Sequence, residues 1–233
     1  SMGTLPVHHA RIRDATSHNP RFLHDIGASL CLMLSSDFIE DSNILHKKRV
    51  MFPKEGEGLG GSIDLMVTVV KELRIGPYKF KNVPTYIFDD TYNITNYPYM
   101  AGLIGNDILR RFNSIINYSR RDIYLIPNSH IRESFDYSYS GAELYFEDEK
   151  AVLGHVSENS PAQLAGLREG DEVIAINNVF SLDFTQLKAA LSSSTGKIKV
   201  IVKRDGEMMQ FEYKPLNINQ RKKRISVRKK PNK

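Results

Sequence analysis

The stretch Phe22-Leu23-His24-Asp25-Ile26-Gly27-Ala28-Ser29 decides how this chain is interpreted. It places one acidic residue, Asp25, at the end of an apolar segment and follows it with a Gly-Ala bend. Small residues allow the backbone to turn tightly, so the carboxylate leaves the strand at a fixed angle. This placement is typical of a reactive group, and Asp25 is therefore the candidate catalytic residue.

The composition is that of a globular chain, with 41% hydrophobic and 25% charged residues among 233. This length favours two domains over one. No apolar run approaches the ~18 to 20 residues that a membrane-spanning helix needs, so no transmembrane segment is expected. A single cysteine, Cys31, excludes an internal disulfide and a Cys-rich metal site. His8-His9 lacks a third ligand nearby, and we expect neither a metal nor a cofactor.

The net charge of +5 comes from the C-terminal end of the chain. Residues 216–233 hold eight Lys and Arg and no acid, so the remainder carries −3. Segment 217–233 is predicted to be a solvated, disordered tail. No aromatic side chain lies between its basic residues to stack on bases, and no nucleic-acid partner is expected.

Short runs of Val, Ile, Leu, Tyr and Phe, broken by Gly, Pro and Asn, extend to about residue 128. This pattern is typical of strands joined by turns, so residues 1–128 are predicted to form a mainly β unit. Asp107–Phe112 is the expected helix, with Asn106 as its cap. The expected strands are Ile63–Val70, Lys71–Ile75, Val83–Phe88, Ser114–Tyr118 and Asp122–Ile126.

Residues 129–140 are predicted to be a linker whose aromatic side chains pack on a neighbouring domain. Residues 141–216 then change pattern and predict a small α+β unit. Its expected strands are Ala142–Phe146, Ala151–Val156, Glu172–Ile176, Ile198–Val202 and Met208–Tyr213. Its expected helices are Pro161–Gly166 and Phe184–Ser192.

The segment Ser160–Asn177, SPAQLAGLREGDEVIAIN, closely resembles bacterial PDZ domains. In that family a peptide adds as a strand beside the second strand, and its end is held by the preceding loop. Glu143 departs from the family pattern, because its charge would repel the terminal carboxylate of a peptide. The resemblance places the peptide-binding site at Ser140, Gly141, Ala142, Glu143, Leu144, Leu187 and Leu191.

The Asp25-Ile26-Gly27-Ala28-Ser29 loop and the later segment Leu103-Ile104-Gly105 together resemble the retropepsin and pepsin-like aspartic proteases. In those proteins an apolar-apolar-Gly segment crosses beneath the loop that holds the catalytic Asp. Gly58, Gly60 and Gly61 are similar to the Gly-rich flap that closes over substrate. The order of these segments matches bacterial members with a C-terminal PDZ domain, which implies an acid-protease β-barrel lobe and, as an expectation, export to the periplasm or cell surface.

Peptide hydrolysis by this route needs two carboxylates that share one proton, and the chain holds one such motif. Either two chains meet about a two-fold axis, each contributing Asp25, or a second lobe is missing. The similar bacterial proteins have two lobes ahead of the PDZ domain, so residues 1–128 are expected to be one of two lobes. The expected partners are a peptide or protein substrate and a second lobe, in cis or from a homodimer.

Ile26 is the departure with the largest consequence for function. The family has Thr or Ser at this position, whose hydroxyl hydrogen-bonds to the partner loop. Ile has no hydroxyl and is stiff at χ1, so the two carboxylates are expected to be held less firmly. Two interpretations follow: an aspartic endopeptidase whose PDZ domain presents or gates substrate, or a non-catalytic binding protein with a degenerate protease lobe.

Overall fold

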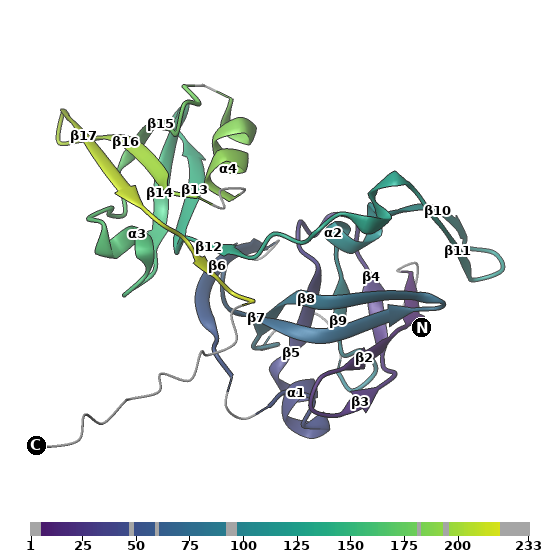
Figure 1. The fold of residues 1–233 in the computed structure, drawn as a ribbon. Helices are drawn as coiled ribbons and strands as arrows, with labels where there is room; N and C mark the ends of the chain where they lie inside the picture. The colour runs from purple at the N-terminus through teal and green to yellow at the C-terminus, as the bar shows by residue number, and fades with distance from the viewer. Residues whose placement is uncertain are drawn as a thin grey trace, which may run out of the picture.

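Figure 1 shows the computed structural model, which describes residues 6–46, 49–58, 61–91, 97–180, 183–192 and 196–219. The fold is mainly β, as predicted, with a curled half-barrel sheet followed by a smaller α+β unit. Most of the predicted basic tail, from residue 220 onward, lies outside the described residues. None of the described helices is both long and apolar enough to cross a bilayer.

The N-terminal unit is built on one large sheet, with nine strands among the described residues. Its order is β1-β4-β9-β5-β8-β7-β2-β3, and β6 pairs with β7. Helix α1 (Ser36–Ser42) follows β5 and is capped by the Ser35 hydroxyl. The strands are β1 (Val7–His9), β2 (Arg11–Arg13), β3 (Ser17–His18), β4 (Arg21–His24), β5 (Leu32–Ser35), β6 (Phe52–Gly58), β7 (Gly61–Ile75), β8 (Tyr78–Phe88) and β9 (Gly102–Ile104).

Strand β7 is longer than the sequence predicts. Two strands were expected, Ile63–Val70 and Lys71–Ile75, but the backbone continues through both as one strand. Its pairing with β8 runs from Leu65↔Phe88 to Ile75↔Tyr78. The polar residues Lys71 and Glu72 interrupt the apolar pattern of the sequence. The backbone pairing of β7 with β8 nevertheless continues past them, so the strand does not end there.

The short strand β9 lies between β4 and β5, parallel to the first and antiparallel to the second. The position of β9 between its two neighbours requires glycine at its first residue, Gly102, and directly after its last residue, at Gly105. A Cβ at Gly102 would lie 1.9 Å from the Met33 carbonyl oxygen, and one at Gly105 would lie 2.2 Å from the Leu30 carbonyl oxygen. The three strands therefore pack more closely than side chains at these two positions would permit.

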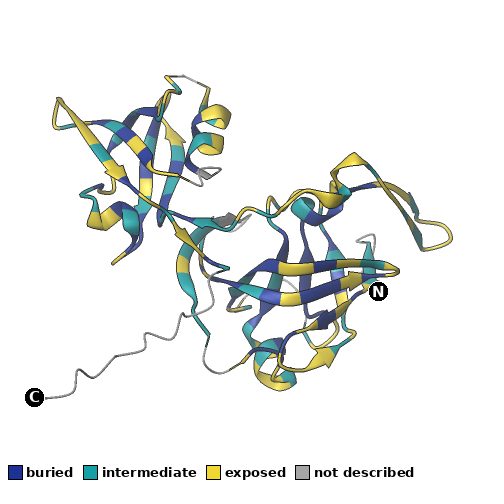
Figure 2. Cartoon of the chain, in the orientation of Figure 1, coloured by how far each residue is buried: buried dark blue, intermediate teal, exposed yellow. Residues whose placement is uncertain are grey.

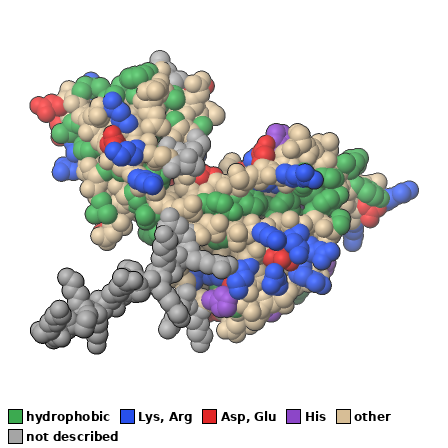
Figure 3. All heavy atoms as spheres, in the orientation of Figure 1, with side chains coloured by type: hydrophobic (Ala, Val, Ile, Leu, Met, Phe, Trp, Pro, Cys, Tyr) green, Lys and Arg blue, Asp and Glu red, His purple; other side chains and the backbone are tan. Residues whose placement is uncertain are grey.

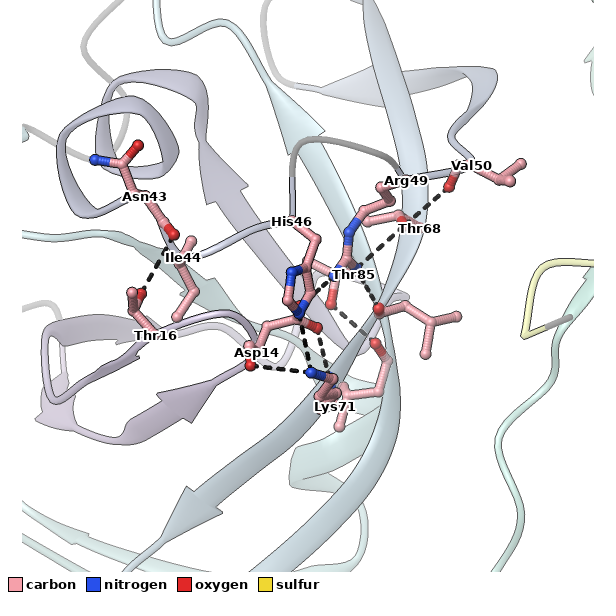
Figure 4. A network of polar contacts seen from close by, with 12 residues as sticks. Asp14, Thr16, Asn43, Ile44, His46, Arg49, Val50, Thr68, Lys71 and Thr85 are labelled. Carbon is pink, nitrogen blue, oxygen red and sulfur yellow. Dashed lines mark hydrogen bonds and ion pairs between the residues drawn. The ribbon is translucent and has the colours of Figure 1, made fainter. Parts of the chain in front are cut away.

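The buried carboxylate of Asp14 ties the end of β2 to β7 and to the segment before β6 (Figure 4). It contacts the guanidinium of Arg49 and accepts a hydrogen bond of 3.0 Å from the Lys71 backbone N–H. Arg49 also donates to the Val69 carbonyl. Because a buried charge is tolerated only when it is paired, this network fixes the start of β6 against β7.

Helix α2 (Asn106–Leu109) is shorter than the predicted helix Asp107–Phe112. Phe112 instead begins β10 (Phe112–Asn117), which pairs with β11 (Asp122–Pro127) in a two-stranded ribbon. The apolar spacing at 108, 109 and 112 fits a helix, but the Phe112 ring packs edge-on against Tyr78 at 5.0 Å between ring centroids. This core contact directs residue 112 into a strand.

The C-terminal unit matches its predicted elements closely. Ser160 caps α3 and Pro161 occupies its first turn, as the motif predicts. The buried Asp171 accepts hydrogen bonds of 2.6 and 2.7 Å from Arg204, which joins β15 to β16. The elements are β13 (Ala142–Glu147), β14 (Lys150–Val156), α3 (Pro161–Leu164), β15 (Glu172–Ile176), α4 (Phe184–Ser192), β16 (Ile198–Arg204) and β17 (Glu207–Tyr213).

The connection between the two units lies against the N-terminal unit, and its aromatic side chains pack there as predicted. It contains η1 (Ser129–Arg132) and β12 (Ser138–Tyr139), and β12 pairs with β18 (Leu216–Asn217). The Tyr137 hydroxyl donates to the Asn82 carbonyl at 2.8 Å. The segment is therefore a packed connection and not a free tether.

Candidate active site

Asp25 lies at the end of β4, where the chain leaves the sheet in a tight loop. Its Oδ1 atom accepts hydrogen bonds from the Gly27 and Ala28 backbone N–H groups, at 2.8 and 3.2 Å. A Cβ at Gly27 would lie 3.2 Å from Oδ1, so the small residue keeps this turn open. One carboxylate oxygen is thus held by the loop's own backbone, which orients the side chain.

The segment Leu103-Ile104-Gly105 and the residue that follows it are hydrogen-bonded to this loop. The Asp25 N–H donates to the Ile104 carbonyl at 3.0 Å. The Gly105 N–H donates to the Cys31 carbonyl at 3.0 Å, and the Asn106 N–H to the Ala28 carbonyl at 2.8 Å. Both arms of the Asp25 loop are therefore hydrogen-bonded to one continuous segment, which makes the loop a stiff platform for the carboxylate.

Ile26 and Ser29 of this loop are exposed, and 70% of the Ile26 surface is accessible. An isolated apolar side chain at the surface needs no explanation, but this one directly follows the candidate catalytic Asp. The hydrogen bonds that the structure describes for the Asp25 carboxylate all come from its own loop.

Sequence analysis missed a buried histidine pair beside Asp25. His8 and His24 pack edge to face with ring centroids 5.4 Å apart, and their four ring nitrogens are buried without a hydrogen-bond partner. Burial lowers the pKa of His8 to about 4, helped by the neighbouring His24 and His9. Burial also lowers the pKa of His24, although the Asp25 charge opposes this. The available signal was the position of His24 in the apolar strand before Asp25.

This pair makes the stability of the N-terminal unit depend on pH. The folded state disfavours protonation of His8, so the unfolded state binds more protons between about pH 6.5 and 4. The free energy of unfolding is therefore fully retained above pH 6.5 and is expected to fall by about 3 kcal/mol as the pH drops to 4. Urea denaturation followed by circular dichroism across this range measures the loss.

A matched pair of substitutions separates this effect from general acid denaturation. His8→Leu is expected to reduce the acid-induced loss, and the lowered pKa of His24 accounts for what remains. His9→Leu, at the exposed neighbouring position of β1, is expected to preserve most of the loss, because His9 is the smallest of the three causes. An identical acid-induced loss in wild type and His8→Leu would contradict the assignment.

The hairpin β6–β7 carries the predicted flap glycines. Gly58 pairs with Gly61 across the two strands, and Gly61 has a φ of 105° that glycine adopts without strain. Gly60 lies outside the described residues.

The residues predicted for peptide binding in the C-terminal unit divide into two groups. Leu144, Leu187 and Leu191 are buried together in the core of that unit. Ser140, Gly141 and Ala142 form a loop closed on itself: the Ala142 N–H donates to the Ser140 hydroxyl at 3.1 Å. Strand β13 is the edge of its sheet, where a peptide strand could add.

Comparison with known families finds a match for each of the two units. Residues 9–108 match the aspartyl protease family, and residues 154–204 match the PDZ domain. The chain joins an aspartyl protease lobe to a PDZ domain. No curated protein matches it.

The chain also matches solved structures, and three of these matches extend as follows. A retropepsin-like aspartic protease from Rickettsia conorii is 17% identical with a TM-score of 0.36, covering 52% of this chain and 89% of that one. The PDZ domain of EpsC from Vibrio cholerae is 20% identical with a TM-score of 0.26, covering 34% and 79%. The HtrA-type protease AlgW, solved with a tripeptide, is 13% identical with a TM-score of 0.34, covering 90% and 93%.

The PDZ domain and the connection before it contact the protease lobe along strand β6. The Tyr139 hydroxyl, in the connection just before the PDZ domain, donates to the Pro53 carbonyl at 2.7 Å, and its ring lies 4.8 Å from that of Phe52. Lys54 pairs with Glu143 at 3.2 Å. Glu143, which the sequence predicts to repel a peptide carboxylate, is therefore paired with a cation from the lobe.

The next residue of β6 extends this contact. Glu55 lies 3.1 Å from Nδ1 of His155 on β14, which also lies 3.2 Å from Glu169. Four consecutive residues of β6, 52–55, therefore touch the PDZ domain or its connection. No local pattern predicts this contact, because the partners are about 90 to 100 residues apart in the chain.

Proposed function

We propose that this chain is half of an aspartic endopeptidase, in which Asp25 supplies one of two catalytic carboxylates. The observation that carries the proposal is the braced Asp25 loop: one carboxylate oxygen is held by two backbone N–H groups, and both arms of the loop are tied to residues 104–106. This geometry supports a reactive role more than a structural turn, because a turn aspartate needs no second segment crossing beneath it.

The chemistry follows from placing two such carboxylates face to face. Two like charges about 3 Å apart cannot both ionise, so the pair holds one proton between them. The ionised member removes a proton from water as the water attacks the peptide carbonyl, and the protonated member donates to the carbonyl oxygen. Each lobe must therefore hold its carboxylate rigidly, as the Asp25 loop does.

The second lobe comes from another copy of this chain or from a second lobe of a longer protein, and the exposed ribbon β10–β11 supports such a contact. Ile115 and Tyr124 are paired across the ribbon, and Ile126 lies on the same face; each is about half exposed. Figure 2 shows exposed stretches along this ribbon. Isolated two-stranded ribbons are marginal in water. Because β10 follows α2 closely, a lobe covering this face would also approach the Asp25 loop.

Light scattering at two protein concentrations, followed by a peptide cleavage assay from about pH 3 to 7, tests the proposal. A dimer that cleaves peptides and is blocked by a statine-type inhibitor would support a homodimeric site. A monomer would require the assay to be repeated on a protein that carries two lobes. Absence of cleavage and of inhibitor binding in a two-lobed form would refute the peptidase function.

We further propose that the PDZ domain gates substrate through the flap. Strand β6 pairs only with β7 among the described strands, so its other edge is free for the PDZ domain to hold. Its Lys54 forms an ion pair with Glu143, its Glu55 contacts the His155 ring, and the Pro53 carbonyl accepts a hydrogen bond from Tyr139. A shift of the PDZ domain would therefore move β6 and change how the flap closes.

Breaking the Lys54–Glu143 pair tests this coupling without relying on activity. Lys54→Ala is expected to raise amide hydrogen exchange several-fold in residues 52–58, because a part-buried ion pair restrains the strand. In a cleaving form it is also expected to raise KM more than it changes kcat.

Lys150→Ala is the matched control, because it removes an ion pair of 3.1 Å with Glu172 that lies wholly inside the PDZ domain. Equal exchange at residues 52–58 in wild type and both variants would show that the PDZ domain does not restrain the flap.

A non-catalytic binding protein is the second candidate function, and Ile26 is the observation that favours it. Without a hydroxyl, the exposed Ile26 side chain offers van der Waals contact and no hydrogen bond to a partner loop. If Ile26→Thr gains turnover while the wild-type assembly shows none, the lobe is a degenerate one. If the wild-type assembly itself cleaves peptide, the role of Ile26 is to pack between two active lobes.

A further inference from the structure

One exposed face of the protease lobe carries an unusual concentration of cations. Strands β2, β7 and β8 lie side by side, and two cross-strand rows fix six outward positions. One row is Arg13–Glu72–Lys81 and the other is Arg11–Arg74–Lys79. Five cations therefore surround a single carboxylate, which we call the basic face, and Figure 3 shows Lys and Arg side chains gathered around an acidic one in this region.

This arrangement of charges is unfavourable for the stability of the folded sheet. Arg74 lies directly opposite Arg11 on one side and Lys79 on the other, and like charges at opposed positions destabilise a sheet. Glu72 relieves part of this repulsion by pairing with Arg13 at 2.8 Å and Lys79 at 3.5 Å. Those pairs hold the pKa of Glu72 below its usual value, with the Arg13 hydrogen bond as the main cause. Within the part of the chain that the structure describes, neither Arg11 nor Arg74 has an ion pair of this kind.

We propose that the basic face docks on an anionic membrane surface. Adjacent strands are about 4.8 Å apart and alternate residues about 7 Å apart, so the five cations occupy a flat area of about 10 by 7 Å. A flat area of one sign complements an anionic bilayer, to which each added Lys or Arg strengthens binding about fivefold. A DNA groove instead admits a helix or a two-stranded ribbon, and the six outward positions hold no aromatic side chain for base stacking.

Docking in this way is independent of the peptidase chemistry. The basic face lies on β2, β7 and β8, whereas the Asp25 loop lies between β4 and β5 on the other side of the strand order. Seven residues of the same sign, between Arg221 and Lys230, follow in the C-terminal sequence and add to the attraction. The proposal therefore stands or falls separately from the function assigned to Asp25.

Co-sedimentation of the full chain with lipid vesicles tests the proposal at about 0.15 M salt. The protein is expected to bind phosphatidylcholine vesicles that contain phosphatidylglycerol and to ignore phosphatidylcholine alone. Arg74→Glu reverses one charge at the centre of the three-cation row and is expected to weaken binding about 30-fold. The same substitution places an acid opposite Arg11 and Lys79, so its melting temperature is expected to equal or exceed that of the wild type.

Lys203→Glu is the matched control, because it changes the net charge equally at an exposed site on β16 of the PDZ domain. It is expected to bind vesicles almost as well as the wild type. Equal weakening by both substitutions would show that net charge or the basic tail drives binding, which overturns the proposal. Absence of vesicle binding, or tighter binding to duplex DNA than to anionic vesicles, would also overturn it.

Discussion

Asp25→Asn is expected to abolish peptide cleavage by the assembled, two-lobed enzyme, by about 10³-fold or more. An amide neither shares a proton with the partner carboxylate nor accepts one from water. Its oxygen still accepts the Gly27 and Ala28 N–H groups, so the loop is expected to keep its conformation. The measurement is kcat/KM for one peptide, alongside the melting temperature and the oligomeric state.

Asp107→Asn is the matched control for this experiment. Asp107 lies in the first turn of α2, close along the chain to the same site, and about half of its side chain is exposed. It is expected to retain cleavage within a few-fold of the wild type. Full activity in Asp25→Asn would exclude the proposed chemistry, and loss of assembly in that variant would assign Asp25 a role in the fold.

Gly105→Ala is expected to cost the protease lobe about 3 kcal/mol of unfolding free energy and to displace the Asp25 loop. The added Cβ would lie 2.2 Å from the Leu30 carbonyl oxygen and 2.8 Å from that of Ala28. Both contacts are with backbone that is hydrogen-bonded to residues 105–107, so neither can move without breaking the brace. Urea denaturation measures the cost, followed by circular dichroism because the chain has no tryptophan.

The control for this substitution is Gly196→Ala in the PDZ domain, where an added Cβ meets nothing within 4 Å. Its unfolding free energy is expected to stay within about 0.5 kcal/mol of the wild type. A Gly105→Ala protein as stable as the wild type would show that the Asp25 loop tolerates a wider separation from residue 105. The proposal that the loop holds Asp25 rigidly would then be wrong.

Local patterns predicted the PDZ domain best. Ser160 and Pro161 begin α3, and Phe184–Ser192 is the observed helix α4, because caps and apolar spacing act within a few residues. The same rules failed at Asp107–Phe112, where a helical spacing leads into a strand. There the Phe112 ring packs against Tyr78, and a contact across the fold outweighs the local preference.

The sequence predicted the segments that form the candidate site, but not the residues that pack beside them. Asp25 and Gly105 stand in recognisable motifs, and the backbone hydrogen bonds between their segments follow the expected crossing. The burial of His8 beside His24 was missed, because strand pairing, and not sequence spacing, brings the two rings together. The role of Asp25 itself stays a prediction until its partner carboxylate is identified.

The sequence by itself determined that this chain is mainly β, that it holds a protease lobe and a PDZ domain, and that it carries one Asp-x-Gly-Ala loop. These properties depend on residue types at short spacing, which act through turns, caps and strand alternation. Only the tertiary structure decided that β6 contacts the PDZ domain and that five cations meet around Glu72. Both depend on strands distant in sequence lying side by side, and their register is set by the burial of the whole sheet.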